Sequence, residues 1–210
     1  MKNLPLYENA QKEIEKLDKE YIEIHNAKYG VDSPYHLHRE MRPCPFEGDL
    51  LKARVVLLLG NPHFLPGEST PVDHVPIEDW GLWGLNESCG TSKWWRPRIR
   101  SLLSNSDDNN LWHEMSFKIA SFQTVAWASP RFHRCTRLPS KELQKSWLRS
   151  LAAERKDTLF VVMRNRAYWD SVLEKTPARR IYTRNPRCSY LTKNNFNTDY
   201  DWNVLSECLT

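Results

Sequence analysis

The sequence predicts an α/β fold, a three-layer sandwich in which helices flank a central four-stranded parallel sheet. Three observations lead to this fold class. Short apolar runs typical of buried strands recur along the chain, segments with helical periodicity lie between them, and residues 54–60 hold five consecutive aliphatic side chains. Strands that alternate with helices form parallel sheets, because each helix carries the chain back over one face.

The first expected element is an N-terminal helix. Residues 8–28 are highly charged, and Ile14, Leu17, Tyr21 and Ile24 recur at helical spacing. This pattern is typical of an amphipathic helix that packs on the rest of the domain through one apolar face.

The remaining elements follow from the same alternation of patterns. Strands are predicted at 54–60, 121–127, 158–163 and 179–183, and helices from Thr91 or Ser92 to Leu103, from Pro139 to about Leu151, at 166–174 and from Asp201. The Pro- and Gly-containing stretch at 61–90 has no clear periodicity, and a loop of that length inside a compact domain is usually functional. With 210 residues and no repeat or low-complexity segment, we expect a single domain over 1–210.

The charge distribution points to a polyanion. The net charge is only +4, but Lys and Arg gather in three clusters near predicted strand ends: Lys93 to Arg100, Arg131 to Arg137 and Arg179 to Arg187. Such clusters suit a nucleic acid, although each could also be a solvated surface patch. The expected partner is therefore a polyanion. We expect the protein itself to be a monomer.

Cysteine usage and hydropathy indicate the compartment. The five cysteines are odd in number and contain no C-x-x-C pair, which disfavours a disulfide framework, a zinc site or an iron–sulfur cluster. The sequence shows neither an apolar signal segment nor a run long enough to span a bilayer. We therefore expect a cytoplasmic protein without membrane contact, metal or cofactor.

Two Asn-Pro dipeptides stand at the ends of predicted strands. Asn61-Pro62 follows the run at 54–60, and Asn185-Pro186 follows the short run at 179–183. Open α/β sheets hold their ligands outside the carboxyl ends of the strands, so both asparagines are candidate site residues. Asn-Pro is also a common turn dipeptide, and either asparagine could instead satisfy its own backbone.

With these motifs the chain resembles the uracil-DNA glycosylase superfamily over about residues 43–195. The first family motif, a strand ending in Gly-x-Asn-Pro-Gly or a close relative, stands here as Leu59-Gly60-Asn61-Pro62-His63. The second, His-Pro-Ser or Asn-Pro-Ser, stands as Asn185-Pro186-Arg187. An Asn in both motifs is similar to the mismatch-specific branch. Supporting similarities in the expected order are Pro45-Phe46-Glu47-Gly48, Trp94-Trp95-Arg96-Pro97 and Val125 to Pro130.

The resemblance implies a monofunctional DNA glycosylase that hydrolyses the bond between a flipped base and its sugar. Asn61 would position the attacking water through its side-chain carbonyl, because a carboxamide cannot act as a general base near neutral pH. Asn185 would donate a hydrogen bond to a carbonyl of the departing base. Base contacts are expected from Pro62, His63, Phe64, Trp80 and Trp83, and DNA contacts from Arg96, Arg98, Arg187, Ser189 and Tyr190.

Departures from the family pattern concern which base is removed. His63 replaces the Gly or Tyr that follows Asn-Pro in the family, Arg187 replaces a small residue, and Ser189 stands where a leucine often wedges into the duplex. The wedge would then be Tyr190 or Leu191, or be absent. The substrate is accordingly uracil or a larger modified base, and in the latter case the enzyme would serve antiviral defence by stripping modified bases from phage DNA.

Two other functions remain open from the sequence. A chain that keeps the fold without turnover would be a catalytically inactive DNA-binding module, with salt-dependent binding and no base release. A small-molecule enzyme that cleaves free nucleosides would be indifferent to charge reversal at Arg96, Arg98 and Arg187. The basic clusters weigh against this last function.

Overall fold

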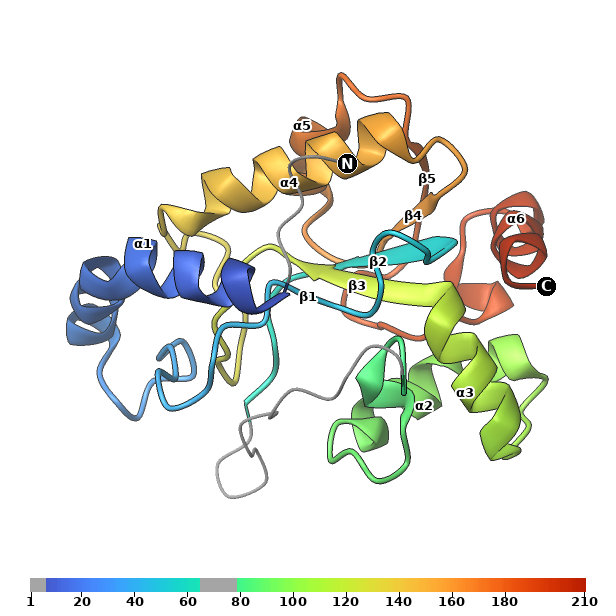
Figure 1. Ribbon diagram of the computed structural model, residues 1–210, viewed down its shortest axis with the longest axis horizontal. Coiled ribbons are helices and arrows are strands. Elements are labelled where there is room, and N and C mark those ends of the chain that lie inside the picture. Colours follow the sequence, from blue (N-terminus) through green and yellow to red (C-terminus); the bar gives the residue numbers. More distant parts are fainter. Residues whose placement is uncertain (1–6, 65–78) are drawn as a thin grey trace.

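The computed structural model describes residues 7–64 and 79–210 and shows a five-stranded sheet between two layers of helices (Figure 1). Four strands run parallel, namely β2 (Val55–Leu59), β3 (Ile119–Gln123), β4 (Leu159–Val162) and β5 (Arg179–Tyr182). The fifth strand, β1 (Phe46–Glu47), pairs antiparallel with β3, which gives the order β1-β3-β2-β4-β5. The predicted α/β class and its four parallel strands are confirmed. The predicted strand number is wrong by one, because a two-residue strand is too short to show a period.

Successive strand residues point to opposite faces of the sheet, and each face has its own apolar core. Even-numbered residues such as Val56 and Phe160 pack with α1 (Tyr7–Tyr29), α4 (Ser140–Glu154) and α5 (Arg166–Leu173). Odd-numbered residues such as Leu57 and Val161 pack with α2 (Ser92–Ile99), α3 (Asn109–Lys118) and α6 (Asp199–Leu209). In Figure 1 α4 and α5 lie above the sheet, α1 lies to its left, and α2 and α3 lie below it.

Helix α1 confirms the predicted N-terminal helix, but its packed face differs from the prediction. Ile14 and Ile22 are buried, whereas Leu17, Tyr21 and Ile24 are exposed, Ile24 to 69%. The buried face of α1 has helical spacing but includes polar residues. A search for apolar residues at helical spacing therefore does not identify this face.

A buried carboxylate sets the rotation of α1. Asp18, which is fully buried, accepts hydrogen bonds from Trp127 Nε1 at 2.9 Å, from Ser140 N at 3.0 Å and from Ser140 Oγ at 2.5 Å. Burial raises the pKa of Asp18, and these hydrogen bonds oppose that shift. Because the Ser140 amide begins α4, Asp18 joins α1 to α4 and also satisfies a donor at a helix N-terminus.

The segment between α2 and β3 contains a helix that the sequence did not indicate. Helix α3 follows a 3-10 turn, Arg100–Leu103, that extends α2 to its predicted end. The Asp108 side chain accepts from the Asn110 amide at 2.9 Å and caps α3. Trp112 and Met115 bury its inner face. The apolar residues of this helix recur with only a weak helical period, and several polar residues lie beside them. For this reason the sequence pattern does not indicate the helix.

The second predicted strand begins and ends earlier than expected. Beyond β3 the chain turns across the end of β2, where the Thr124 amide donates to Leu59 O at 3.2 Å and the Val125 amide donates to Gly60 O at 2.9 Å. Residues 124–129 are all buried although they lie outside the strand. Burial rather than strand pairing therefore explains the apolar run at 121–127.

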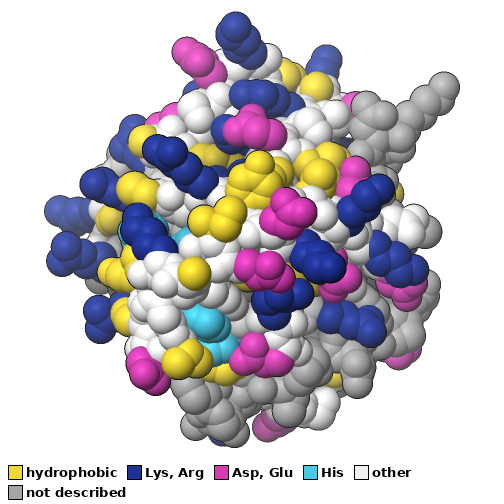
Figure 2. Space-filling model, turned by 90° about the vertical axis from the view of Figure 1, so that its left-hand side faces the viewer, with side chains coloured by type: hydrophobic (Ala, Val, Ile, Leu, Met, Phe, Trp, Pro, Cys, Tyr) yellow, Lys and Arg dark blue, Asp and Glu magenta, His cyan; other side chains and the backbone are white. Residues whose placement is uncertain are grey.

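The parallel strands end on one side of the molecule, where their connections diverge. In Figure 1 β3 runs from α3 toward the left, and this left side faces the viewer in Figure 2. The connection after β2 leads to the layer of α2 and α3, whereas those after β3 and β4 lead to α4 and α5 on the other face. In open α/β sheets ligands bind where such connections diverge, and here that place is the end of β2.

Figure 2 shows that basic and acidic side chains mix over the middle of this side, while Lys and Arg gather along its left-hand edge with few acidic neighbours. The cysteines form no disulfide bond among the described residues. No described helix combines the length and the apolar character needed to cross a membrane.

Candidate active site

Asn61 directly follows Gly60 at the end of β2, and its side chain is held by the segment after β3. Asn61 Nδ2 donates to Pro62 O at 2.8 Å, to Ser129 Oγ at 2.8 Å and to Ser129 O at 3.3 Å. The Ser129 hydroxyl donates its own proton to Arg131 O at 2.9 Å, so it can only accept from Asn61. Every partner of this amide end is therefore an acceptor.

Those acceptors determine which way the carboxamide faces. An NH2 group has two protons to donate to these acceptors, whereas a carbonyl oxygen would be repelled by all of them. Oδ1 of Asn61 must point away from Ser129, and among the described residues no bond engages it. The site thus presents a fixed, uncharged acceptor at the carboxyl end of β2.

The backbone around Asn61 continues the sheet in a modified form. The Ser129 amide donates to Pro62 O at 3.2 Å, and His63 and Ser129 form an isolated parallel bridge. At Gly60 a Cβ atom would lie 2.9 Å from Cγ of Phe132, which no real Cβ tolerates. Gly60 is therefore required for the Phe132 ring to pack against this turn.

The aromatic residues proposed to contact a base are engaged elsewhere. Phe64 is buried and stacks on His38 with ring centroids 3.4 Å apart. Trp80 packs edge-on against Trp83 and against His113 of α3, at 6.5 Å and 4.9 Å between centroids. These contacts place the two tryptophans with α3 rather than beside Asn61. The rest of the predicted loop, residues 65–78, lies outside the described residues.

Asn185 turns its hydrogen-bond donor outward, whereas Asn61 turns its acceptor outward. Its Oδ1 accepts from the Arg187 amide at 2.9 Å, which turns Nδ2 outward, and among the described residues Nδ2 makes no bond. Neighbouring strands lie about 4.8 Å apart and β4 separates β2 from β5, so the two strand ends are roughly 10 Å apart. One end offers an acceptor and the other a donor.

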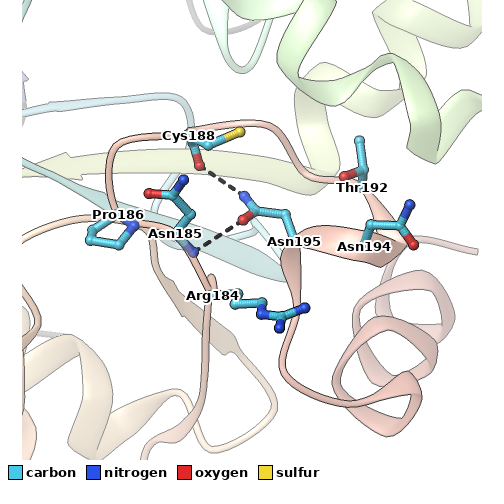
Figure 3. A pocket seen from close by; sticks show the side chains of 7 residues that line it. All are labelled: Arg184, Asn185, Pro186, Cys188, Thr192, Asn194 and Asn195. Atoms are coloured by element: carbon cyan, nitrogen blue, oxygen red, sulfur yellow. Dashed lines mark hydrogen bonds between the residues drawn. The ribbon is translucent and has the colours of Figure 1, made fainter.

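A buried asparagine shapes the loop that carries Asn185. Asn195 accepts from the Asn185 amide at 3.1 Å through Oδ1 and donates to Cys188 O at 2.8 Å and Tyr190 O at 2.7 Å through Nδ2. Figure 3 shows it between Cys188 and Asn185, joined to both by dashed lines. This loop borders a hollow of about 530 Å³ lined by Arg184, Asn185, Pro186, Cys188, Thr192, Asn194 and Asn195.

Two arginines, Arg164 and Arg98, lie between the turns that carry Asn61 and Asn185. Arg164 follows β4, is half-buried and donates through Nε to Ser189 Oγ at 3.1 Å. The Arg98 guanidinium, from α2, lies 5.3 Å from the Tyr190 ring centroid. Partial burial lowers the pKa of His63, and the charges of Arg164 and Arg98 lower it further, which leaves the imidazole neutral at pH 7.

The other predicted DNA contacts behave differently. Arg96 donates to Leu85 O at 2.8 Å and to Asn109 Oδ1 at 2.5 Å, so its guanidinium joins the α2 and α3 segments. Arg187 is exposed on the second Asn-Pro turn, and Tyr190 is 40% exposed. Ser189 is buried, with its hydroxyl on Arg164.

Sequence reasoning missed Ser129, Arg164 and Asn195. Ser129 closely follows the apolar run at 121–127 and Arg164 directly follows the run at 158–163, so position after a strand is an available signal for both. Asn195 lies in a polar stretch without period, and no sequence signal marks it. Comparisons with models of protein families, with curated proteins and with solved structures find no significant match for this chain.

Proposed function

We propose that this protein is a monofunctional DNA glycosylase that hydrolyses the N-glycosidic bond of a flipped uracil-like or modified base. Water adds its oxygen to C1′ of the sugar as the bond to the base breaks. The electron pair of that bond leaves with the base, and the water proton passes to solvent. The product is an abasic site.

The fixed acceptor of Asn61 carries this proposal. A glycosylase without a general base depends on holding its water in the correct place, because orientation alone lowers the barrier. Oδ1 of Asn61 is suited to accept a hydrogen bond from that water, since three acceptors prevent the carboxamide from reversing. Asn185, with its outward Nδ2, would donate to the base as negative charge develops on it.

The direct test is mass spectrometry of free bases released from a panel of DNAs. The panel holds uracil, mismatched and damaged bases in duplexes and single strands, together with phage DNA that carries hypermodified bases. We expect release by the wild type and none by Asn61→Ala, with Asn197→Ala, an exposed residue, as the control. Release from phage DNA alone would assign the enzyme to defence, and release from uracil DNA alone to repair.

One observation favours a second candidate, a DNA-binding module without turnover. Asn185 is exposed, and the hollow beside it has no aromatic lining residue, whereas a flipped base is usually stacked between aromatic or apolar side chains. This candidate predicts salt-dependent DNA binding, no base release from any substrate, and equal DNA affinity for wild type and Asn61→Ala.

A further inference from the structure

We propose that Arg98, Arg164 and Ser189 form a binding site for a phosphate oxyanion between the two Asn-Pro turns. The inference deepens the proposed function by naming a subsite of the same strand-end region. Phosphate binding does not depend on the role of Asn61, so the phosphate site and the glycosylase activity can be tested separately.

Arg98 is held in place but retains unused donors. Its Nη1 donates to Trp94 O at 2.5 Å, and its guanidinium carbon lies 4.1 Å from the Trp94 ring centroid. Tyr190 approaches from the other loop, with its ring centroid at 5.3 Å. Nε is buried without a hydrogen-bond partner, and Nη2 makes no bond within the described residues. Packing between rings fixes the guanidinium plane, so little conformational freedom is lost when it binds a ligand.

Arg164 approaches the same place from β4. Its Nε donates to Ser189 Oγ, and neither Nη atom bonds to a described residue. Ser189 is only 2% exposed, and its hydroxyl, having accepted from Arg164, keeps a proton to donate. The Leu191 amide donates to Arg98 O at 2.8 Å, which ties the loop of Ser189 to the segment that carries Arg98.

The electrostatics of this pair favour an anion. Burial lowers the pKa of both arginines, and the charge of Arg164 lowers that of Arg98 further. No carboxylate from the described residues contacts either guanidinium. Two neighbouring positive charges without a counterion repel one another, and an oxyanion between them would relieve that repulsion.

Two nearby arginines outside the proposed site, unlike Arg98 and Arg164, have their guanidinium groups engaged by other residues. Arg100, at the end of the same helical segment, is paired with Asp107 at 2.7 Å. Arg96 is occupied by Leu85 O and Asn109. Phosphate fits the unpaired arginines best, because its several acceptor oxygens match guanidinium forks and a hydroxyl donor together. The phosphate could belong to a DNA strand or to a free nucleotide.

The experiment measures the affinity of the full-length protein for inorganic phosphate by calorimetry at constant ionic strength. For each of Arg98→Gln and Arg164→Gln we expect about tenfold weaker binding, since each removes charge-assisted hydrogen bonds. Arg100→Gln is the matched control and should bind phosphate as the wild type does. Circular dichroism reports whether each variant folds. Ser189→Ala, which removes no charge, should weaken binding by a smaller factor and serves if an arginine variant unfolds.

The outcomes separate the alternatives. Unchanged phosphate affinity in folded Arg98→Gln and Arg164→Gln, or equal losses in Arg100→Gln, would overturn the site. Competition by an oligonucleotide without terminal phosphates, lost when its linkages are neutral methylphosphonates, assigns the site to DNA backbone. Competition by a nucleoside monophosphate alone assigns it to a free nucleotide. Base release that requires Asn61, with phosphate affinity indifferent to both arginines, would leave the proposed function standing without this site.

Discussion

At the scale of single residues, the orientation of one carboxamide decides what the candidate site can do. Asn61 resembles the turn residue that its dipeptide suggests, since its Nδ2 does bond to Pro62 O. The additional bonds to Ser129 are long-range and fix the face that the side chain shows. The same side chain thus satisfies its own turn through Nδ2 and turns Oδ1 away from Ser129.

Ser129→Ala tests this arrangement. Loss of the hydroxyl removes an acceptor from Nδ2 and lets the carboxamide move, and misplacement of a reacting group by about 1 Å can cost about 100-fold in rate. We expect base release to slow by about this factor, with DNA affinity unchanged. Ser146→Ala, whose hydroxyl donates to Leu143 O within α4, is the control. An unchanged single-turnover rate would show that Ser129 does not position Asn61.

At the scale of elements, buried carboxylates join segments that the apolar pattern leaves unassigned. For Asp18→Ala we expect the free energy of unfolding to fall by about 2–4 kcal/mol, because the Trp127 and Ser140 donors become buried without partners. Ile24→Ala should change it by less than about 0.5 kcal/mol, since Ile24 is exposed. Urea denaturation of both variants provides the measurement, and a larger effect at Ile24 would support the face predicted from sequence.

Glu47 is the second such carboxylate. It accepts from the Gly84 amide at 2.5 Å and from the Trp95 indole, and burial of its carboxyl raises its pKa to about 7 although part of the residue reaches solvent. A raised pKa means that the folded state prefers the protonated form. Stability from this group is therefore complete below pH 4.5, the ordinary value, and is lost as the pH rises toward 7.

This loss can be measured. Between pH 5 and pH 8 the ionisation of Glu47 should lower the free energy of unfolding by up to about 3 kcal/mol in the wild type. Glu47→Gln, which cannot ionise, should remove that part of the pH dependence. Guanidinium chloride denaturation of both proteins at the two pH values is the measurement, and parallel pH profiles would show that Glu47 does not titrate in this range.

The elements that sequence predicted well are those with strong local periods. β2 and β4 are apolar throughout because helices cover both of their faces, and α4 buries Trp147, Leu148 and Leu151 as expected. The missed features depend on contacts between distant residues. The face of α1 follows from Asp18, and the position of Asn185 follows from Asn195, neither of which carries a local signal.

At the scale of the whole molecule, the positive charge is uneven rather than large. A net charge of +4 would give weak steering if spread evenly, but the guanidiniums of Arg98 and Arg164, which form no ion pair with any described residue, lie near each other at the strand ends. If DNA is the partner, its affinity should fall steeply with salt, because each neutralised phosphate releases counterions.

The salt dependence of duplex binding tests this expectation. Plotted as log affinity against log salt concentration, the slope should become shallower by up to about 0.9 in either Arg98→Gln or Arg164→Gln, because both arginines contact the same phosphate. Arg149→Gln should leave the slope unchanged, since Arg149 lies on α4 and donates to Val172 O. Fluorescence anisotropy with a labelled duplex gives the slopes, and equal slopes in all variants would show that these arginines bind no DNA phosphate.

The short strand β1 has a consequence for how copies of the molecule behave toward each other. An uncovered sheet edge offers unpaired amide and carbonyl groups to any other chain, which leads to aggregation. Phe46 and Glu47 occupy part of the β3 edge, and at the opposite edge β5 carries Arg179 and Arg180, whose charges disfavour pairing with an identical strand. Strand β1 at one edge of the sheet and the two arginines of β5 at the other edge thus disfavour aggregation at high protein concentration.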